Sequence, residues 1–352
     1  MANALSVIDV ASFQERRAQG LITGRPHSKH DLIIWNYTPK CQYEQAWDEV
    51  TLQARGLITE PDGTIIARPF RKFMNMEQHE GPLPLEPFKA TEKMDGSLLI
   101  VSTYKGERIV ATRGSFNSDQ ALKANEIIEK RYRDFAFLPA YTYLFEVIYP
   151  GNRIVVDYGK TEDITLLALI HTATGEEKDI HQPEYATSWP FPIVKYYDGI
   201  TDIAVLRQLE EANKEGFVLR FESGLRLKVK FAEYLRLHRL MTQINARILW
   251  ELLKDNEPLE PLLDRVPDEF YTWVKQTCAD LQAQFQAIEQ ECRFELEQVK
   301  DLPTRKEQAA IIATKKYRSV IFSMLDNKKY QDAIWKIIYP AASRPFKIDD
   351  EL

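Results

Sequence analysis

The stretch Thr91-Glu92-Lys93-Met94-Asp95-Gly96-Ser97, followed directly by the apolar residues 98–101, decides the fold that we expect for this chain. Its Lys-x-Asp-Gly pattern is typical of a lysine that attacks the α-phosphate of a nucleoside triphosphate and holds the nucleotide as a phosphoamide. The amine must be neutral to attack. Lowering a lysine pKa from about 10.4 to about 7.5 requires about 4 kcal/mol, which burial and neighbouring cations can supply. So short a pattern also arises by chance, so its weight depends on whether the partners that this chemistry needs are present.

The bulk composition is that of a globular chain with two domains. The chain has 352 residues, 44% hydrophobic and 28% charged, with a net charge of −6. A nucleic-acid site must therefore be a local basic patch. Three scattered cysteines, Cys41, Cys278 and Cys292, suggest neither disulfides nor zinc and fit a reducing, cytoplasmic compartment. No apolar run reaches membrane-spanning length and no signal peptide is evident, so we expect no membrane partner, and nothing suggests more than a monomer.

Short strand signals are dense in the first two-thirds of the chain. Turn signals at Asp62-Gly63, within residues 57–68, and at Lys105-Gly106, between residues 98–104 and 108–112, predict two hairpins. Residues 118–133 carry apolar positions at helical spacing. Further strands are expected at residues 141–148, 165–171, 216–221 and 225–231. This pattern favours antiparallel sheets with flanking helices over a doubly wound parallel sheet.

The character of the sequence changes near residue 240, where Leu, Glu, Gln, Lys and Ala become dominant. An amphipathic helical stripe is formed by Leu281, Phe285, Ile288, Cys292, Leu296 and Val299. Helical signals continue over residues 309–325 and 330–338. We therefore predict an α+β protein, with residues 1–240 as a domain of antiparallel sheets and residues 241–352 as a small all-α domain.

A strand of alternating character supplies the first candidate partner of Lys93. Over residues 225–231, strand periodicity places Arg226, Lys228 and Lys230 on one face and apolar side chains on the other. A row of cations on a strand whose back is buried can bind a triphosphate. Taken alone, a solvent-exposed strand face is the commoner explanation.

Two carboxylates are the next candidates. Glu146 interrupts the apolar residues 143–148, where burial is costly without a cation, a metal or a ligand hydroxyl as partner. The alternative is a half-exposed strand with Glu146 in water. Glu215, before Gly216, opens a further strand and could position a hydrated Mg²⁺, which prefers one or two carboxylates with water and phosphate oxygens. The alternative is an ordinary turn.

Basic residues upstream complete the set. Four of them could meet the β- and γ-phosphates: Arg55, Arg68, Arg71 and Lys72. Tyr37 could pack on a base, although a core tyrosine with a satisfied hydroxyl is the commoner case.

The order of these features resembles the covalent nucleotidyltransferase superfamily and, within it, the RNA ligase 1 family of T-even phages, whose phage enzyme repairs tRNA. Further segments share the resemblance: Trp47-Asp48-Glu49-Val50, Arg113-Gly114-Ser115, Phe145-Glu146, Asn152-Arg153-Ile154-Val155, and Tyr234 with Leu237-His238. The similarity covers roughly residues 31–240, about three-fifths of the chain.

The resemblance implies an ATP-dependent RNA ligase that joins 5′-phosphate and 3′-hydroxyl ends through lysyl-AMP and RNA-adenylate, in repair of RNA and possibly of tRNA. Residues 1–240 would be the adenylyltransferase domain, and the helical domain would bind RNA. Lys93, Glu146 and Tyr234 would be catalytic. The residues implied to bind ATP are Tyr37, Arg55, Lys72, Lys93, Glu146, Glu215, Lys228 and Lys230. Glu146 and Glu215 would hold Mg²⁺, for which Mn²⁺ can substitute.

The chain departs from the family pattern at two places. Arg113 stands where the phage enzyme has a lysine. The positive charge is kept, but a planar guanidinium replaces the compact ammonium group. The phage enzyme also carries an acidic metal contact in its helical domain, and Asp255, Glu257 and Glu260 are equal candidates here.

Two other functions were weighed. A DNA ligase or capping enzyme of the same superfamily usually carries an OB-fold after the last motif, and residues 241–352 lack its strand pattern. A non-catalytic RNA-binding protein on a ligase fold would bind RNA without taking up AMP, although every charged catalytic position is present.

Overall fold

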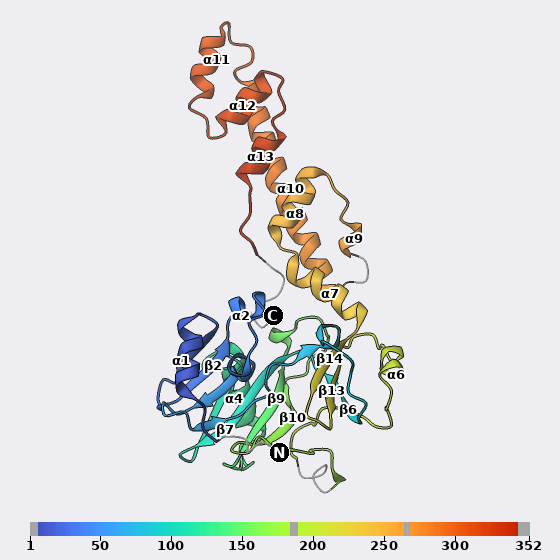
Figure 1. Cartoon of the computed structure of the whole chain (residues 1–352). Coiled ribbons are helices and arrows are strands. Elements are labelled where there is room, and N and C mark those ends of the chain that lie inside the picture. The colour runs from blue at the N-terminus through green and yellow to red at the C-terminus, as the bar shows by residue number, and fades with distance from the viewer. Residues whose placement is uncertain (1–5, 184–188, 264–265, 267, 344–352) are drawn as a thin grey trace. The chain divides into compact units, whose positions relative to one another are not determined.

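The computed structural model describes residues 6–183, 189–263, 266 and 268–343, and the chain forms two compact units, residues 1–235 and 236–352 (Figure 1). The first unit is built on three sheets, in which every strand pairing is antiparallel except that of β5 with β14. The predicted α+β class, with antiparallel sheets and a helical C-terminal region, is confirmed.

Each sheet has a simple strand order. The N-terminal sheet consists of β1 (Ile22–Pro26), β2 (Ile33–Tyr37), β3 (Arg55–Thr59) and β4 (Ile65–Ala67) in that order. The central sheet has the order β11 (Glu177–Lys178), β10 (Asp163–His171), β9 (Tyr141–Ile148), β7 (Ser97–Tyr104), β8 (Glu107–Thr112). The third sheet has the order β12 (Tyr196–Tyr197), β6 (Phe88–Lys93), β13 (Gly216–Phe221), β14 (Arg226–Lys230), β5 (Met74–Asn75).

Helices of the first unit are short, apart from α4. They are α1 (Val10–Ala18), α2 (Pro39–Tyr43), α3 (Glu49–Gln53), α4 (Asp119–Arg131) and α6 (Ile203–Gln208), with single 3₁₀ turns at Met76–Gln78 and Pro150–Asn152. The helix predicted over residues 118–133 is α4. It begins after Ser118, whose hydroxyl accepts a hydrogen bond from the Ala121 N–H at 3.2 Å.

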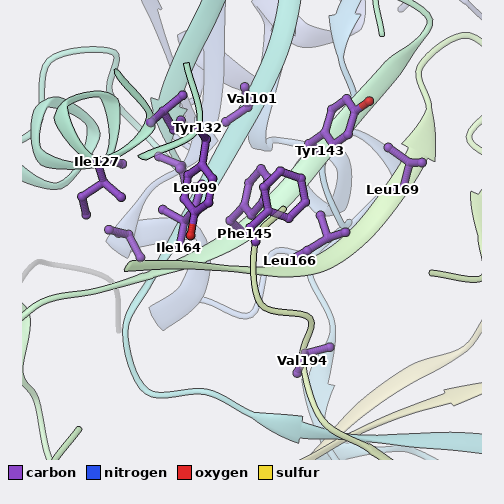
Figure 2. Close-up of a cluster of buried hydrophobic side chains, with 14 of the residues drawn as sticks. Leu99, Val101, Ile127, Tyr132, Tyr143, Phe145, Ile164, Leu166, Leu169 and Val194 are labelled. Carbon is purple, nitrogen blue, oxygen red and sulfur yellow. The ribbon is translucent and has the colours of Figure 1, made fainter. Parts of the chain in front are cut away.

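The central sheet is buried on both faces. One face packs against α4, and Leu99 and Phe145 share a large apolar cluster with Ile127 of that helix (Figure 2). On the other face, Leu98, Ile100 and Leu144 join Ile34 and Ile58 of the N-terminal sheet in a second cluster. Because both faces are covered, β7 reads as a continuous apolar run. This run follows the Lys93 loop directly, so the loop is fixed to the most deeply buried sheet.

The two predicted hairpins are confirmed. β3 pairs with β4 across Asp62-Gly63, and β7 pairs with β8 across Lys105-Gly106. The strand expected over residues 225–231 is β14, in which Leu227 and Val229 are buried and the intervening basic side chains are partly exposed.

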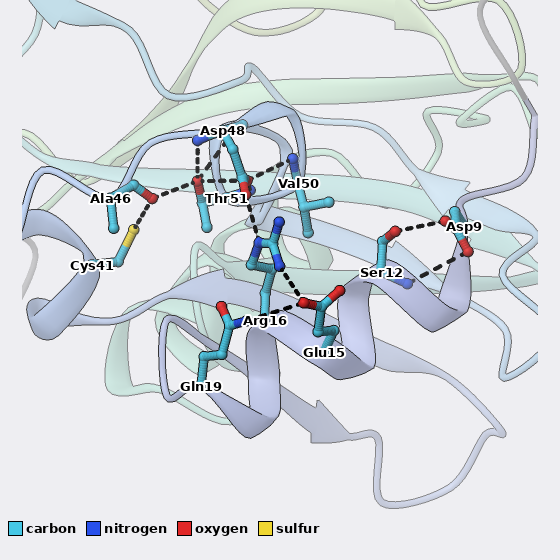
Figure 3. A network of polar contacts seen from close by, with 10 residues as sticks. All are labelled: Asp9, Ser12, Glu15, Arg16, Gln19, Cys41, Ala46, Asp48, Val50 and Thr51. Carbon is cyan, nitrogen blue, oxygen red and sulfur yellow. Dashed lines mark hydrogen bonds and ion pairs between the residues drawn. The ribbon is translucent and has the colours of Figure 1, made fainter.

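The Trp47-Asp48-Glu49-Val50 block joins α3 to α1. The Asp48 carboxylate accepts hydrogen bonds from the backbone N–H groups of Val50 and Thr51 and pairs with Arg16 of α1 at 2.5 Å (Figure 3). The Thr51 hydroxyl in turn accepts from the Asp48 N–H, which completes a capping box. These hydrogen bonds therefore fix the start of α3 and the position of Trp47, the residue before Asp48.

The regular secondary structure in the described residues of the second unit is helical. It contains most of α7 (Ala232–Gln243), then α8 (Ala246–Asp255), α9 (Glu260–Leu263), α10 (Asp268–Glu297), α11 (Arg305–Ile312), α12 (Arg318–Leu325) and α13 (Gln331–Ile337). The predicted stripe lies on α10 and just beyond it, and its members pack against Trp250, Val320 and Trp335 in one apolar cluster. The helical signal predicted over residues 309–325 is interrupted, because residues 313–317 form a turn between α11 and α12.

Candidate active site

Strand register brings Lys93, Lys230 and Glu215 together at the ends of three adjacent strands of the third sheet. β13 lies between β6 and β14, and Gly216 pairs with Lys93 on one side and with Lys230 on the other. Glu215 and Lys230 therefore meet Lys93, although they lie 122 and 137 positions after it in the sequence, because three neighbouring strands start or end at the same level.

Glu215 bridges two lysines. Its Oε2 lies 2.7 Å from the Lys93 Nζ and its Oε1 lies 2.9 Å from the Lys230 Nζ. The Glu215 side chain is only 2% exposed, and those of Lys93 and Lys230 are 19% and 18% exposed. The alternative interpretation of Glu215 as an ordinary turn residue is therefore wrong.

The charges of Glu215 and Lys93 shift each other's pKa in opposite directions. Burial alone would raise the pKa of Glu215, but Lys93 and Lys230 outweigh it and lower that pKa below its ordinary value. Burial alone would lower the pKa of Lys93, but the Glu215 carboxylate, with Glu146 and Asp95, raises it. The attack on a phosphate needs a lysine of lowered pKa, whereas the neighbouring Glu215 carboxylate raises the pKa of Lys93 in this structure.

Four more cations lie around the lysine. The pKa of Lys228 is well below its ordinary value because of burial and the charges of Lys93, Arg55, Lys72 and Lys230. Its Nζ lies 4.9 Å from the Phe73 ring centroid, and the Arg55 guanidinium lies 5.6 Å from the same centroid. The surroundings of Lys228 are thus buried and strongly cationic, so an anion placed there would be stabilised.

Lys72 approaches the cluster from the loop between β4 and β5. Its Nζ lies 5.3 Å from the ring centroids of both Tyr37 and Trp47, and burial lowers its pKa. Tyr37 is a core residue whose hydroxyl accepts a hydrogen bond from Arg113 at 2.6 Å, which is the commoner case considered from sequence. The Arg113 guanidinium also lies over the Tyr37 ring, 4.9 Å from the ring centroid. Both contacts of Arg113 with Tyr37 are therefore made inside the protein.

Glu146 is buried and contacts residues 93–97, which carry the predicted nucleophile and which we call the nucleophile loop. Its Oε1 accepts a hydrogen bond from the Gly96 N–H at 3.0 Å. A Cβ at Gly96 would lie 2.6 Å from the Val147 carbonyl oxygen and 3.0 Å from the Glu146 Cγ. The glycine is therefore required by the close approach of β9, and the alternative of Glu146 in open water is wrong.

Tyr234 reaches the site from the first turn of α7. The side chain is buried, its hydroxyl donates to the Asp95 Oδ1 at 2.8 Å, and its ring centroid lies 5.2 Å from the Lys230 Nζ. Sequence reasoning missed Asp95 as a structural centre, although it stands inside the Lys-x-Asp-Gly pattern.

Two predicted phosphate contacts have partners within the protein. Arg68 donates to the carbonyl oxygens of Thr172 and Ala173 at 2.8 and 3.4 Å, and Arg71 pairs with Glu49 at 2.7 Å. Both arginines also line the cavity that contains Lys72, so their contact with the phosphates stays a prediction. The acidic candidates Asp255, Glu257 and Glu260 all belong to the second unit.

A cavity of about 1420 Å³ adjoins the cation cluster. Its lining includes Trp47, Lys72, Phe73 and Arg226, but neither Lys93 nor Glu215. The cavity therefore lies beside Lys72 and Arg226 and not at Lys93.

The described residues contain no group of three or more His, Cys, Asp and Glu side chains arranged to hold a metal ion. The two buried carboxylates, Glu146 and Glu215, nevertheless suit a Mg²⁺ ion that takes most of its ligands from water and phosphate oxygens. Among the helices of the described part of the chain, none is long and apolar enough to cross a membrane.

Antiparallel sheets that bring a Lys-x-Asp-Gly lysine, a Glu-Gly carboxylate and a Lys-x-Lys strand together define a nucleotidyltransferase-type fold and site. Comparison with protein families narrows this class. The model of an RNA ligase family, typified by phage T4 RNA ligase 1, matches residues 53–235. The match spans just over half of the chain, and the chain belongs to this RNA ligase family. The resemblance found in the sequence is thereby confirmed.

Individual relatives agree with the family. An RNA ligase of Rhodothermus phage RM378 is 23% identical over 325 residues, covering 70% of this chain and 73% of the relative. A protein of Autographa californica nuclear polyhedrosis virus, named as a bifunctional polynucleotide kinase/RNA ligase, is 27% identical over 246 residues. That match covers 60% of this chain, which spans about a third (34%) of the viral protein.

Solved structures of similar fold include an archaeal ATP-dependent RNA ligase, with a TM-score of 0.46, 15% identity, and coverage of 88% of this chain and 87% of that one. A mutant of Naegleria gruberi RNA ligase with ATP and Mn has a TM-score of 0.36 and 14% identity, and the match covers 44% of this chain and 52% of the other.

Proposed function

We propose that this RNA ligase is ATP-dependent and joins RNA 5′-phosphate and 3′-hydroxyl ends through lysyl-AMP and RNA-adenylate. The observation that carries the proposal is Lys93 on a buried glutamate beside four further cations, Arg55, Lys72, Lys228 and Lys230. Such a cluster suits a polyanion whose α-phosphate must lie against the lysine amine.

The first step forms a P–N bond between the Lys93 Nζ and the α-phosphorus and breaks the bond to pyrophosphate. Arg55, Lys72 and Lys228 would stabilise the charge that develops on the leaving pyrophosphate. The cavity beside Lys72 offers room for that end of ATP. AMP then passes to the RNA 5′-phosphate, and the 3′-hydroxyl attacks the activated phosphate and releases AMP.

Glu215 controls when Lys93 can attack. The amine must lose a proton, and the Glu215 carboxylate opposes that loss by raising the pKa of Lys93. Mg²⁺ held by Glu215 and Glu146 would neutralise phosphate charge and compete with Lys93 for the carboxylate. Once the Glu215 charge is shared, the pKa of Lys93 falls, because burial and the Lys230 charge both favour the neutral amine.

The role of the second unit is also part of the proposal. We assign it to RNA binding, in RNA repair with tRNA as one candidate substrate, in a monomeric and cytoplasmic protein. Its described residues form helices and no strands, so they offer no OB-fold strands of the kind that DNA ligases and capping enzymes use.

Ligation itself tests the proposal. Single-stranded RNA with a labelled 5′-phosphate and a free 3′-hydroxyl should be sealed with ATP and Mg²⁺, and Lys93→Ala should abolish sealing. Nicked DNA, run alongside, should be sealed poorly. Preferential sealing of nicked DNA would assign the enzyme to DNA, and normal sealing by Lys93→Ala would contradict the covalent mechanism.

A further inference from the structure

The Asn152-Arg153-Ile154-Val155 motif lies outside the Glu215 ion pairs and the cation cluster. It opens a segment, residues 152–158, that follows β9 and folds back onto the nucleophile loop, and we call this segment the strap. At its start, the Asn152 Nδ2 donates to the Ser97 Oγ at 3.1 Å and to the Val147 carbonyl oxygen at 3.3 Å. The strap is therefore tied to the first residue of β7.

Asp95 joins the strap to the nucleophile loop through three hydrogen bonds. Its Oδ2 accepts from the N–H groups of Val155 and Val156, both at 2.8 Å. Its own N–H donates to the Tyr158 hydroxyl at 2.9 Å. The Asp95 side chain is buried, with the residue 3% exposed, so these bonds are shielded from water.

The remaining oxygen of Asp95 connects the loop to α7, because it accepts the Tyr234 hydroxyl at 2.8 Å. The strap is held a second time by Asn213, whose side chain exchanges two hydrogen bonds with the Asp157 backbone at 2.7 and 2.8 Å. Asn213 precedes Glu215 by two residues. The buried Asp95 carboxylate thus links the nucleophile loop, the strap and α7. Through the hydrogen bonds of Asn213, the strap is also connected to the segment that carries Glu215.

We propose that Asp95 is a positioning residue for Lys93, and that Tyr234 serves the reaction through Asp95 without touching the reacting atoms. The inference rests on the proposed lysyl-AMP chemistry. Asp95 lies two residues from Lys93, so a shift of its carboxylate moves the backbone that carries the nucleophile. In-line attack tolerates little misplacement, and an error of about 1 Å can cost about a hundredfold in rate.

Single variants give the expected pattern in single-turnover lysyl-AMP formation. Asp95→Ala should slow the step about a hundredfold at saturating ATP, while the apparent ATP affinity changes less than about threefold. Asp95→Asn should recover at least about tenfold of that loss, because an amide oxygen still accepts from the strap. Tyr234→Phe should slow the step about tenfold, the effect of one hydrogen bond to a charged acceptor.

Combining the two changes decides whether Tyr234 acts through Asp95. Asp95→Ala with Tyr234→Phe should be as slow as Asp95→Ala alone, within about threefold. Losses that multiply would overturn the inference, because Tyr234 would then act independently, for example through Glu215. Tyr132 and Asp163 form a matched control pair, since the Tyr132 hydroxyl also donates to a carboxylate, at 2.5 Å, away from the site. Tyr132→Phe and Asp163→Asn should leave lysyl-AMP formation unchanged.

The outcome separates this inference from the proposed function. If the unaltered protein takes up AMP and both Asp95 variants stay within about threefold of it, Asp95 has no positioning role and the ligase proposal stands. If the unaltered protein takes up none, the ligase proposal itself fails. Thermal unfolding is followed for each variant, and Asp95→Asn with Tyr234→Phe decides the question if Asp95→Ala does not fold.

Discussion

At the scale of single residues, the site is organised by one buried carboxylate that holds two lysines. The Glu215 pKa is lowered and the Lys93 pKa is raised, so both charges stabilise the folded state. The Glu215 contribution is present above its ordinary pKa of 4.5 and is lost as the pH falls through the lower folded value. The Lys93 contribution is present below 10.5 and is lost as the pH rises through the higher folded value.

Glu215→Gln should therefore destabilise the protein by about 3 kcal/mol at pH 7, because it leaves two buried lysines without their anion. The difference between the variant and the unaltered protein should shrink as the pH falls below 4.5 and through the lower folded pKa of Glu215, where the carboxylate becomes protonated. Urea unfolding at pH 7 and at a series of acidic pH values measures both quantities. A difference that stays constant throughout the acidic series would contradict the ion-pair account.

Lys228 makes the opposite contribution to stability. Its folded pKa lies well below 10.5, so at neutral pH its charge destabilises the folded protein. Lys228→Met should raise the free energy of unfolding by about 1 kcal/mol and slow lysyl-AMP formation at least about tenfold. Lys105→Met, at the exposed turn between β7 and β8, should change neither by a measurable amount. A destabilised Lys228→Met variant would mean that Lys228 is not held as a strained cation.

At the scale of elements, strand register determines which residues meet. The expectation that Lys93, Glu215 and the Lys-x-Lys strand act together came from the resemblance of their order to the nucleotidyltransferase superfamily, because β6 and β13 are far apart in sequence and no local pattern predicts their pairing. Arg68 and Arg71 could not be assigned in this way, because their partners, Thr172 and Glu49, are set by loop geometry. Asp95 was missed for the same reason: its partners lie 60 to 139 positions away, outside any repeating pattern.

The pairing of β13 with β14 depends on Gly216. Its φ is +145°, and a Cβ there would lie 2.0 Å from the Val229 carbonyl oxygen. Gly216→Ala should destabilise the protein by about 3 kcal/mol and disturb the Glu215 ion pairs, because the two strands must move apart. Gly106→Ala is the control: its φ is +80° but nothing lies within 4 Å, so only about 1 kcal/mol of backbone strain is expected. Equal losses in the two variants, by thermal unfolding, would exclude the steric explanation.

At the scale of the whole molecule, each unit has an apolar core of its own. The first unit contains every residue of the candidate site, and the second packs around Trp250 and Trp335. The sequence indicated the change to helical character near residue 240 because apolar spacing changes from strand to helix there. It contained no comparable signal for what the helical unit binds.

A chain that ends after Gln243 should still form lysyl-AMP, because the nucleotide site lies within the first unit. RNA sealing by this shortened chain should fall at least about tenfold if the second unit binds RNA. Parallel assays of ATP labelling and RNA sealing measure the two activities. Full sealing by the shortened chain would show that the helical unit is dispensable for RNA.

The central claim is that Lys93 is an adenylylated nucleophile, and one measurement tests it most directly. The pure protein is incubated with Mg²⁺ and α-labelled ATP, denatured, and examined for label that stays with the chain, with GTP and Lys93→Ala alongside. Acid-labile label from ATP alone, absent in Lys93→Ala, is the predicted result. Label from GTP would indicate a capping enzyme. No label from either nucleotide, in folded protein freed of bound AMP, would contradict the ligase mechanism and leave an RNA-binding protein.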